Sequence, residues 1–346
     1  MAFTFDRMNK IEERLSAWWR FEEQDRPCIL STIPTDGKKY QSDLDRFWSD
    51  PDLRTSFAID QIDASTYLGE AVPFHYVDLG SSAMAALLGS RMEYVDLETV
   101  WAYPIYDRLE PIAEILIDRG NRYYRYLRET TARSASFAEN HHFVTHFALG
   151  APGDTLAALY GTEALLIDMV ERPEVVESAM NRLKRIWIEC FTEFGNLISK
   201  SGNRGSVGWA GVWAPGTTFP MQEDFSYMIS PSMYRRFCLP HIGDLADAIE
   251  WPMYHLDGMG AIAHLDALLE LEQLRVIQWV PGSGHEDIEQ WYSLINRIIE
   301  RGKSVQIFAR AEEIEFLSNL GSRGVLITVS DPSAENTSRL ADRYDI

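Results

Sequence analysis

A histidine and an aspartate stand two residues apart at the end of an apolar run, in the segment YHLDGMG (254–260). If the run is a β-strand, His255 and Asp257 point to the same face, because side chains alternate along a strand. An imidazole and a carboxylate on one face can bind a divalent cation or exchange protons with a substrate. The competing interpretation is that Asp257 caps the following turn by accepting backbone N–H groups.

Other polar and aromatic side chains end or follow apolar runs. Glu223 and Asp224, in TTFPMQEDF (217–225), are candidate catalytic carboxylates, although exposed loop positions explain them equally simply. Three tryptophans, Trp209, Trp213 and Trp279, and Tyr254 suit stacking on an aromatic or sugar-like substrate. Core packing is the alternative for the tryptophans. His141 and His142 are expected at the surface, and His264 in a structural role. The candidate substrate-binding residues are Trp209, Trp213, Tyr254, Gln278, Trp279, Gln306, Arg310, His146 and Asp78.

Eight apolar runs of strand length position these residues. They cover 28–34, 74–80, 143–150, 205–213, 252–258, 276–282, 304–310 and 325–331. Helical segments follow the later runs, for example at 230–250 and 286–302. Strands that alternate with helices predict a parallel sheet, and this number of units favours an α/β protein with a (β/α)8 TIM barrel. In such a barrel the carboxyl ends of the strands carry the active site.

The N-terminal segment predicts an amphipathic helix over residues 8–23. Met8, Ile11, Leu15, Trp18 and Trp19 recur there at helical spacing. We expect this helix, within residues 1–25, to pack on the barrel as an extension of one domain that spans residues 1–346. The chain has neither a G-x-G-x-x-G pattern after the first strand nor a P-loop, so no nucleotide cofactor is expected.

Charge and cysteine content narrow the class of protein. The formal net charge of −20 argues against binding to nucleic acid or to anionic membranes. The three cysteines have no metal-binding spacing, which predicts reduced thiols and a cytoplasmic protein. The N-terminus lacks the apolar core of a signal peptide, and no apolar run is long enough to span a bilayer.

Three segments, 220–242, 254–270 and 277–284, resemble the uroporphyrinogen decarboxylase-like superfamily. That superfamily contains haem-pathway decarboxylases and the corrinoid and coenzyme M methyltransferases. The likeness begins at Arg26-Pro27, continues through FALGAPGDTLAAL (147–159) and reaches the last strand. It implies a single (β/α)8 barrel that is often dimeric, and hence a homodimer, but it does not specify the reaction.

Two departures from the decarboxylases exclude the tetrapyrrole reaction as the expected function. Their arginine-rich segment after the first strand, which clamps substrate carboxylates, is missing from 26–40, where only Lys38 and Lys39 remain. Their Gly-His-Gly at the last strand is replaced here by TVSDPS (328–333). We therefore expect no decarboxylation of uroporphyrinogen.

The methyltransferases of the superfamily hold zinc with a His-x-Cys pair and a second cysteine on the last strand. His255 matches the histidine, Asp257 replaces the first cysteine, and Thr328 or Ser330 stands at the second. Glu223 matches an acidic position of the family, which implies a zinc or other divalent metal site of His255, Asp257 and Glu223.

The resemblance and the residues leave three functions open. The first is methyl transfer on a small organic substrate with a divalent metal, in which a corrinoid enters only through a separate protein. The second is a metal-free acid–base lyase or hydrolase that uses Asp257 with Glu223 or Asp224. The third is a non-catalytic binding protein on the same fold.

Overall fold

The computed structural model describes residues 7–34 and 43–344, so Lys38 and Lys39 lie outside the described residues. The helices are α1 (Met8–Trp19), α2 (Leu44–Phe47), α3 (Pro51–Ala64), α4 (Ala83–Leu87), α5 (Arg122–Ala135), α6 (Pro152–Tyr160), α7 (Thr162–Glu171), α8 (Pro173–Ile198), α9 (Pro231–Phe237), α10 (Leu239–Asp247), α11 (Gly258–Ala261), α12 (Leu265–Leu269), α13 (Tyr292–Glu300), α14 (Ile314–Leu317) and α15 (Ala334–Tyr344). The strands are β1 (Cys28–Ile33), β2 (Thr66–Gly69), β3 (Phe74–His75), β4 (Arg91–Tyr94), β5 (Val100–Tyr103), β6 (Phe143–Val144), β7 (Ser206–Val207), β8 (Trp213–Ala214), β9 (Thr218–Met221), β10 (Trp251–Asp257), β11 (Val276–Val280), β12 (Ser304–Ala309) and β13 (Val325–Val329).

One seven-stranded sheet carries the predicted parallel pairing. Its order is β2-β1-β13-β12-β11-β10-β9, and every neighbouring pair is parallel except β1 with β2. The central strands are buried along almost their whole length, as expected for strands that are covered on both faces. The prediction of a parallel α/β sheet is therefore confirmed.

The remaining strands form short pairs outside this sheet. β3 and β6 are parallel to each other, with Phe74 opposite Phe143 and His75 opposite Val144. β4 and β5 form an antiparallel hairpin, which is not among the eight apolar runs that predicted strands. The arrangement is compatible with a barrel. Among the described residues, however, the hydrogen bonds do not close the strands into a ring, and the barrel itself therefore stays a prediction.

The strand predicted at 205–213 is wrong. This run divides into β7 and β8, which form an antiparallel pair, and β9 takes the place beside β10 instead. Glycines explain the break. Gly211 has a positive φ of 76°, and a Cβ on Gly208 would meet Cδ of Pro220 at 2.6 Å.

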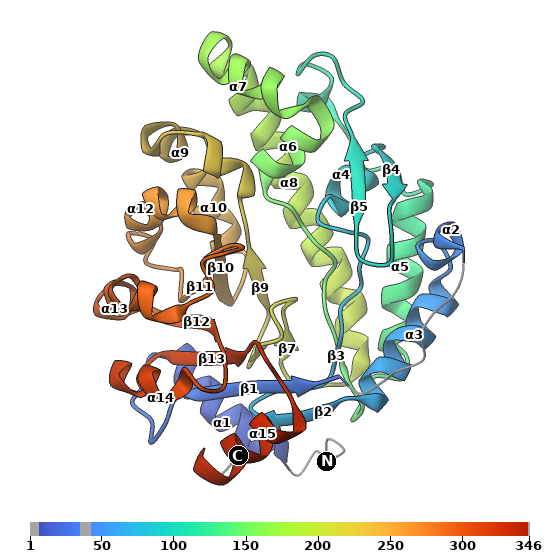
Figure 1. Ribbon diagram of the computed structural model, residues 1–346. Coiled ribbons are helices and arrows are strands. Elements are labelled where there is room, and N and C mark those ends of the chain that lie inside the picture. The colour runs from blue at the N-terminus through green and yellow to red at the C-terminus, as the bar shows by residue number, and fades with distance from the viewer. Residues whose placement is uncertain (1–6, 35–42, 345–346) are drawn as a thin grey trace.

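Helices cover the strands on two sides (Figure 1). On one side, toward the right of the view, are α3, α5 and α8. On the other side, at the left, α9, α10, α12, α13 and α14 lie along β9–β13. The β4–β5 hairpin extends beside α6, and the described ends of the chain both lie near β1 and β2. No helix among the described residues is long and apolar enough to cross a membrane.

The N-terminal helix is present, although it ends at Trp19 and not at residue 23. Its predicted apolar face is buried, and Leu15 and Trp18 are completely inaccessible to solvent. The indole of Trp18 donates a hydrogen bond to the carbonyl oxygen of Gly324, and the indole of Trp19 donates one to that of Trp213. These two hydrogen bonds connect α1 to β8 and to the residue that precedes β13.

Replacing Leu15 by alanine is expected to lower the free energy of unfolding by about 2–5 kcal/mol, because it leaves a cavity at a fully buried site. Denaturant unfolding measures this change. The matched control is Glu13→Ala on the exposed face of α1, which should stay within about 0.5 kcal/mol of the wild type. A loss below about 0.5 kcal/mol for Leu15→Ala would mean that α1 packs only loosely.

Candidate metal centre

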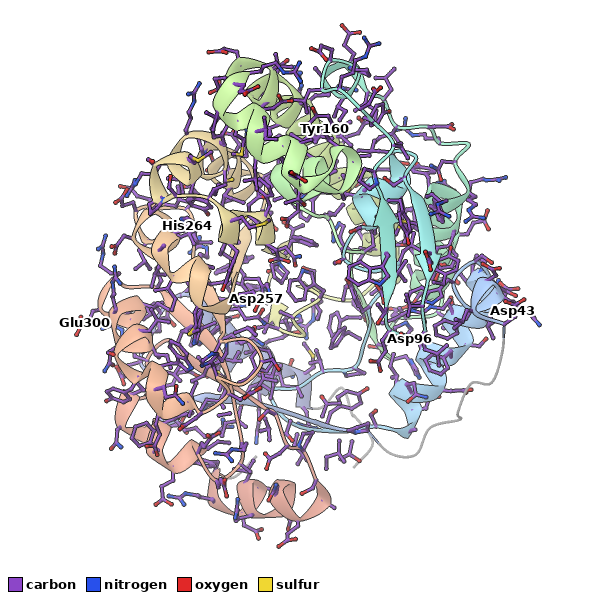
Figure 2. All side chains as sticks on the ribbon, turned by 45° about the horizontal axis from the view of Figure 1, so that its top comes forward. Asp43, Asp96, Tyr160, Asp257, His264 and Glu300 are labelled. Carbon is purple, nitrogen blue, oxygen red and sulfur yellow. The ribbon has the colours of Figure 1, made fainter. Side chains whose placement is uncertain are left out.

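His255 and Asp257 lie two residues apart at the C-terminal end of β10, where the alternation of side chains along the strand puts both on one face. Figure 2 shows Asp257 near the middle of the view, whereas Glu300 lies at the rim. The Nε2 atom of His255 is 4.0 Å from Oδ2 of Asp257. Asp257 occupies the N-cap position of α11, yet within the described residues its carboxylate accepts no capping hydrogen bond. The helix-cap interpretation is therefore wrong, and this carboxylate is left for other partners.

A row of buried amides fixes the orientation of the His255 ring. His255, Gln278 and Gln306 are register partners on β10, β11 and β12. Nδ1 of His255 is 2.5 Å from Oε1 of Gln278, and Nε2 of Gln278 is 2.8 Å from Oε1 of Gln306. Nε2 of Gln306 donates to the carbonyl oxygen of Ala210 at 3.2 Å and to Oγ1 of Thr328 at 3.0 Å.

The polarity of this row determines the tautomer of His255. The carbonyl oxygen of Ala210 can only accept, so Gln306 presents its amide nitrogen there and its oxygen to Gln278. Gln278 then presents its own oxygen to His255, whose Nδ1 must carry the hydrogen. Nε2 is left with its lone pair, on the side where Asp257 lies. Such orientation by a hydrogen bond to the other ring nitrogen is typical of metal-binding histidines.

Asp224 completes a cluster with His255 and Asp257. It begins the short 3₁₀ helix η4 (Asp224–Met228), which follows β9. One ligand atom from each of these three side chains lies within 4.8 Å of the other two. Although Asp224 is open to solvent, the protein atoms around it raise the pKa of this carboxyl group; His255 lowers it, and the nearby Asp257 raises it again. Two carboxylates and an imidazole lone pair at this spacing repel one another, and a cation or a proton relieves the repulsion.

Glu223 turns away from this cluster and is buried, not exposed as a loop residue would be. Its Oε1 accepts from the backbone N–H of Asp154 at 2.7 Å, and its Oε2 accepts from that of Gly153 at 3.3 Å, in the first turn of α6. In return, the Asp154 carboxylate accepts from the N–H groups of Asp224 and Phe225. The two buried carboxyl groups thus cap each other's segments.

The pKa values of this carboxyl pair reflect its burial. Burial first, and then the charge of Asp224, raise the pKa of Asp154 to about 7. Burial and the charge of Asp154 raise the pKa of Glu223 well above its usual range. Burial therefore favours the protonated form of this pair. The hydrogen bonds of its two carboxyl groups hold η4, with Asp224 at its start, against α6.

A cavity of about 510 Å³ opens beside Asp224, between α6, η4 and the β4–β5 hairpin. Its wall combines polar groups with the apolar side chains of Trp101 and Met228, both largely exposed. No arginine or lysine lines it among the described residues. The polar residues that line it include Ser81, Ser82, Asp154, Thr155, Gln222 and Asp224.

Three further predicted residues, Gln278, Gln306 and Trp209, surround or orient the ring of His255, whereas Arg310 is paired elsewhere. Gln278 and Gln306 orient its ring, as described above. Trp209 packs edge-on against the imidazole, with ring centroids 5.0 Å apart, and its indole donates to the carbonyl oxygen of Pro220. Arg310 follows β12 directly and pairs with Glu312 and Glu313.

The other predicted substrate-binding residues lie in the core. Trp213 donates to the carbonyl oxygen of Arg204 in the cluster beneath α1. Tyr254 is on the opposite face of β10 from His255 and meets Tyr234. Trp279 packs edge-on against Trp291. The structure does not bring these three side chains to the metal-type cluster.

His146 and Asp78 are likewise bound elsewhere. Nε2 of His146 is 3.0 Å from the carbonyl oxygen of Phe191, and the two rings stack. Asp78 accepts from the N–H of Gly80 and faces the Arg54 guanidinium at 3.9 Å. His264 has the structural role that was expected, stacked on Tyr234 and bonded to the carbonyl oxygen of Ser226.

Asp154 lines the cavity of the candidate site, and the sequence did not reveal it. It follows Pro152-Gly153, a dipeptide that reads as the start of a helix, and nothing local indicates a partner 70 residues away. The one sequence feature that could have indicated the contact is Gly153. In the structure a Cβ at this position would meet Oε1 of Glu223 at 2.4 Å, so only glycine leaves room for the Glu223 carboxylate. A glycine at the first turn of a helix is consistent with such a close approach.

Comparisons with known proteins give one kind of match. No family model matches this sequence, and no curated protein matches it significantly. Among solved structures, the chain is similar to a methyltransferase from Methanosarcina mazei, with a TM-score of 0.58 and 11% sequence identity. The match covers 97% of this chain and 98% of that one. At this identity the likeness establishes a shared overall fold along essentially the whole chain.

Proposed function

We propose that this protein is an enzyme that transfers a methyl group on a small organic substrate, with a divalent metal ion bound by Asp224, His255 and Asp257. The observation that carries the proposal is the convergence of their three ligand atoms within 4.8 Å, next to a cavity. Asp224 takes the place in the ligand set that the sequence had suggested for Glu223, because the oxygens of Glu223 are engaged by α6.

The donor set fits a catalytic metal ion. One imidazole nitrogen and two carboxylate oxygens suit zinc, manganese or iron(II), and leave coordination positions for substrate and water. The hydrogen bond from Nδ1 of His255 to Gln278 gives the ring the tautomer that ligation through Nε2 requires. No thiolate is in the set, which distinguishes it from the zinc sites of the methyltransferases that the sequence resembles.

The fold likeness to the Methanosarcina mazei methyltransferase supports this reaction class. On that basis we propose a divergent uroporphyrinogen decarboxylase-like (β/α)8 barrel that acts as a homodimer. The methyl donor or acceptor is then a thiol or a corrinoid on a separate protein.

The chain's own groups have distinct tasks in this proposal. A bound divalent metal would supply Lewis-acid activation of the substrate or of its nucleophile. Asp224 belongs to the cluster and also lines the cavity, so its carboxylate would bind the metal ion at the side from which a substrate reaches it. Trp209 packs on the His255 ring and, with the amide row, keeps Nε2 directed at the two carboxylates. Trp101 and Met228 give the cavity an apolar wall that an apolar part of the substrate can contact.

A metal-free acid–base reaction is the second candidate, and the raised pKa of Asp224 is the observation that favours it. Here a proton in place of a metal would relieve the repulsion between Asp224 and Asp257, and one carboxyl group would act as acid while the other acts as base. The two candidates differ in their response to chelation, which abolishes only the metal-dependent reaction.

Methyl transfer is tested with methylcobalamin and a panel of small thiols. We expect demethylation of the cobalamin, which its absorbance measures. The reaction should stop after chelation and return with added zinc or manganese. Asp247→Asn, at an exposed carboxylate at the end of α10, is the control and should leave the rate unchanged. Turnover that survives complete chelation would favour the acid–base reaction instead.

Replacing Gln278 by leucine is expected to weaken metal binding by about 10–100-fold, because the His255 ring loses the partner that orients it. Calorimetric titration with zinc measures the change. The matched control is Thr328→Val, which removes one acceptor of Gln306 but leaves the carbonyl oxygen of Ala210. Equal affinities in Gln278→Leu and the wild type would show that the amide row has no role in ligation.

A further inference from the structure

A continuous line of hydrogen bonds joins the surface to the buried side of β3. Nε2 of His141 is 3.0 Å from Oδ1 of Asp63, and Nδ1 of His141 is 2.9 Å from Nδ1 of His142. Oγ of Ser134 lies 2.9 Å from Nε2 of His142 and 2.9 Å from Nδ1 of His75. Two of these residues, His141 and His142, were expected at the surface; that expectation is wrong for His142, whose exposed fraction is 1%.

Burial increases along this line. The side chains of Asp63 and His141 are 61% and 39% exposed, whereas Ser134 and His75 are 0% and 3% exposed. Asp63 belongs to α3, Ser134 to α5 and His75 to β3, three elements that pack against one another (Figure 1). The line therefore crosses the layer between the outer helices and the strand.

An ionised Asp63 gives the line one direction. The carboxylate only accepts, so Nε2 of His141 carries a hydrogen, and a neutral His141 then accepts at Nδ1. His142 donates from Nδ1 and accepts from the Ser134 hydroxyl at Nε2. Ser134 in turn accepts from Nδ1 of His75, which leaves the lone pair of His75 on Nε2. Each donor meets one acceptor, and no group is left over.

A second cavity lies at the inner end. It measures about 290 Å³ and is lined by His75 together with residues of β1, α3 and β2. Its wall is partly aromatic, through Phe57, Phe74 and Tyr76, and it includes Arg54, whose Nε is buried without a hydrogen-bond partner among the described residues. It shares no lining residue with the cavity beside Asp224.

We propose that Asp63, His141, His142, Ser134 and His75 form a proton relay, and that the cavity at His75 binds a small weak acid whose proton the relay releases to solvent. The geometry supports both parts, since His75 and Arg54 line the same cavity. The weak acid would lie between a nitrogen lone pair that takes its proton and a guanidinium that stabilises its anion.

The relay takes up one proton at His75 and releases one at Asp63, and each hydrogen bond between them reverses its direction. The acid gives its proton to Nε2 of His75, whose Nδ1–H bond breaks as the hydrogen passes to Ser134. The Ser134 hydroxyl hydrogen passes to Nε2 of His142, the Nδ1 hydrogen of His142 to Nδ1 of His141, and the Nε2 hydrogen of His141 to Asp63 and then to solvent. At the end the anion accepts a hydrogen bond from Nε2–H of His75, and one proton has been released at the surface.

Every histidine of the relay is neutral before and after the transfer, because only tautomers change. Burial, followed by His142 and Arg54, lowers the pKa of His75 to about 3, and burial, followed by His141, lowers that of His142 to about 4. These low values oppose a stable imidazolium but do not oppose a change of tautomer. The charged groups facing the relay are Asp63 and Arg54 from α3 and Asp78, which follows β3; the titratable phenols at its cavity are Tyr67 and Tyr76.

Histidine tautomers resolved by ¹⁵N NMR test the relay. At neutral pH we expect hydrogen on Nδ1 of His75, Nδ1 of His142 and Nε2 of His141. Adding a proton to His141 at low pH gives it two N–H groups and reverses the line, so both nitrogen signals of His75 should exchange their protonated and unprotonated character at the midpoint of His141. His146, which is buried but bonded to a backbone carbonyl, should show no such exchange.

Two variants separate the relay from simple burial. Ser134→Ala should abolish the response of His75 to His141 while His141 still titrates. Asp63→Asn, at an exposed position with little risk to folding, should leave His75 as a mixture of tautomers at neutral pH. Glu129→Gln, on the exposed face of α5, removes the same charge and should behave as the wild type. A His75 response that survives Ser134→Ala, or a His75 signal that never follows His141, would overturn the relay.

The cavity is tested with 4-nitrophenol, whose anion has its own visible absorbance. Below the pKa of the free phenol, the wild type should show a saturable rise in anion absorbance with release of one proton for each molecule bound. Ser134→Ala should lose both effects, and Glu129→Gln should keep them. Binding without proton release, or no saturable binding, would overturn the assignment of a weak acid to this cavity. Neither experiment depends on the metal or on methyl transfer.

Discussion

Replacing Asp257 by asparagine is expected to weaken the binding of zinc by at least about 100-fold, equivalent to about 3 kcal/mol, with little change in the stability of the fold. Asparagine keeps the size of the side chain but removes the charge that opposes the cation. The Asp257 carboxylate caps no helix in the described structure, so its loss removes no hydrogen bond of the fold. Calorimetric titration gives the affinity, and denaturant unfolding gives the stability.

Asp247→Asn is the matched control, since it removes an exposed carboxylate that has no place in the cluster. The pH dependence gives a further check. Ligation needs a neutral His255 and ionised carboxylates, so zinc affinity should fall as the pH is lowered. Asp257→Asn should also lower the pKa of Asp224, because Asp257 is one of the groups that raise it. Wild-type affinity in Asp257→Asn would remove this residue from the ligand set.

Stability should fall as the pH rises from about 4 to 7, through the buried pair Asp154 and Glu223. Their pKa values are raised in the folded protein, that of Asp154 to about 7, above the values of about 4 expected in the unfolded chain. The folded state thus binds more protons in this range. Its stabilisation is complete below the unfolded pKa and is lost as the pH passes through the folded one. The expected loss from the pair is on the order of 3 kcal/mol.

Asp154→Asn isolates this contribution, because it removes one titrating group and the charge that raises the pKa of Glu223. Unfolding free energies measured from pH 4.5 to 7.5 should fall less steeply in the variant, by roughly 1 kcal/mol per pH unit. Asp247→Asn should follow the wild type. Parallel curves for Asp154→Asn and the wild type would mean that both carboxyl groups are already ionised in this range.

The sheet and part of the site could be predicted from sequence because they follow from local rules. Continuous apolar runs followed by helical segments predict parallel strands, and β10–β13 have that form. The two-residue spacing of His255 and Asp257 places both side chains on one face of β10. The stripe from Met8 to Trp19 likewise predicts the buried face of α1.

The ligand set depended on contacts between distant segments. Glu223 and Asp224 are adjacent and chemically alike, and the sequence cannot tell which one faces His255. The choice follows from α6, whose first-turn N–H groups bind Glu223 and whose Asp154 holds the start of η4. Similarly, alternation along β11 could not decide between Gln278 and Trp279, and the structure turns Gln278 to His255 and Trp279 to Trp291.

Burial of short polar segments was equally hard to foresee. Two adjacent histidines after the polar residues Glu139 and Asn140 suggest a surface position, yet His142 is buried and bonded to Ser134 of α5. The break of the 205–213 run had a visible signal in Gly208 and Gly211, but strong β-formers such as Val207 and Trp209 masked it.

The most direct measurement is anomalous diffraction at the zinc edge from crystals of the untagged protein grown with zinc. We expect one strong peak about 2.0–2.2 Å from Nε2 of His255 and from a carboxylate oxygen of both Asp224 and Asp257, and its absence in His255→Ala crystals. A map with no peak at this cluster, or with zinc bound only at other sites, would contradict the proposed metal centre.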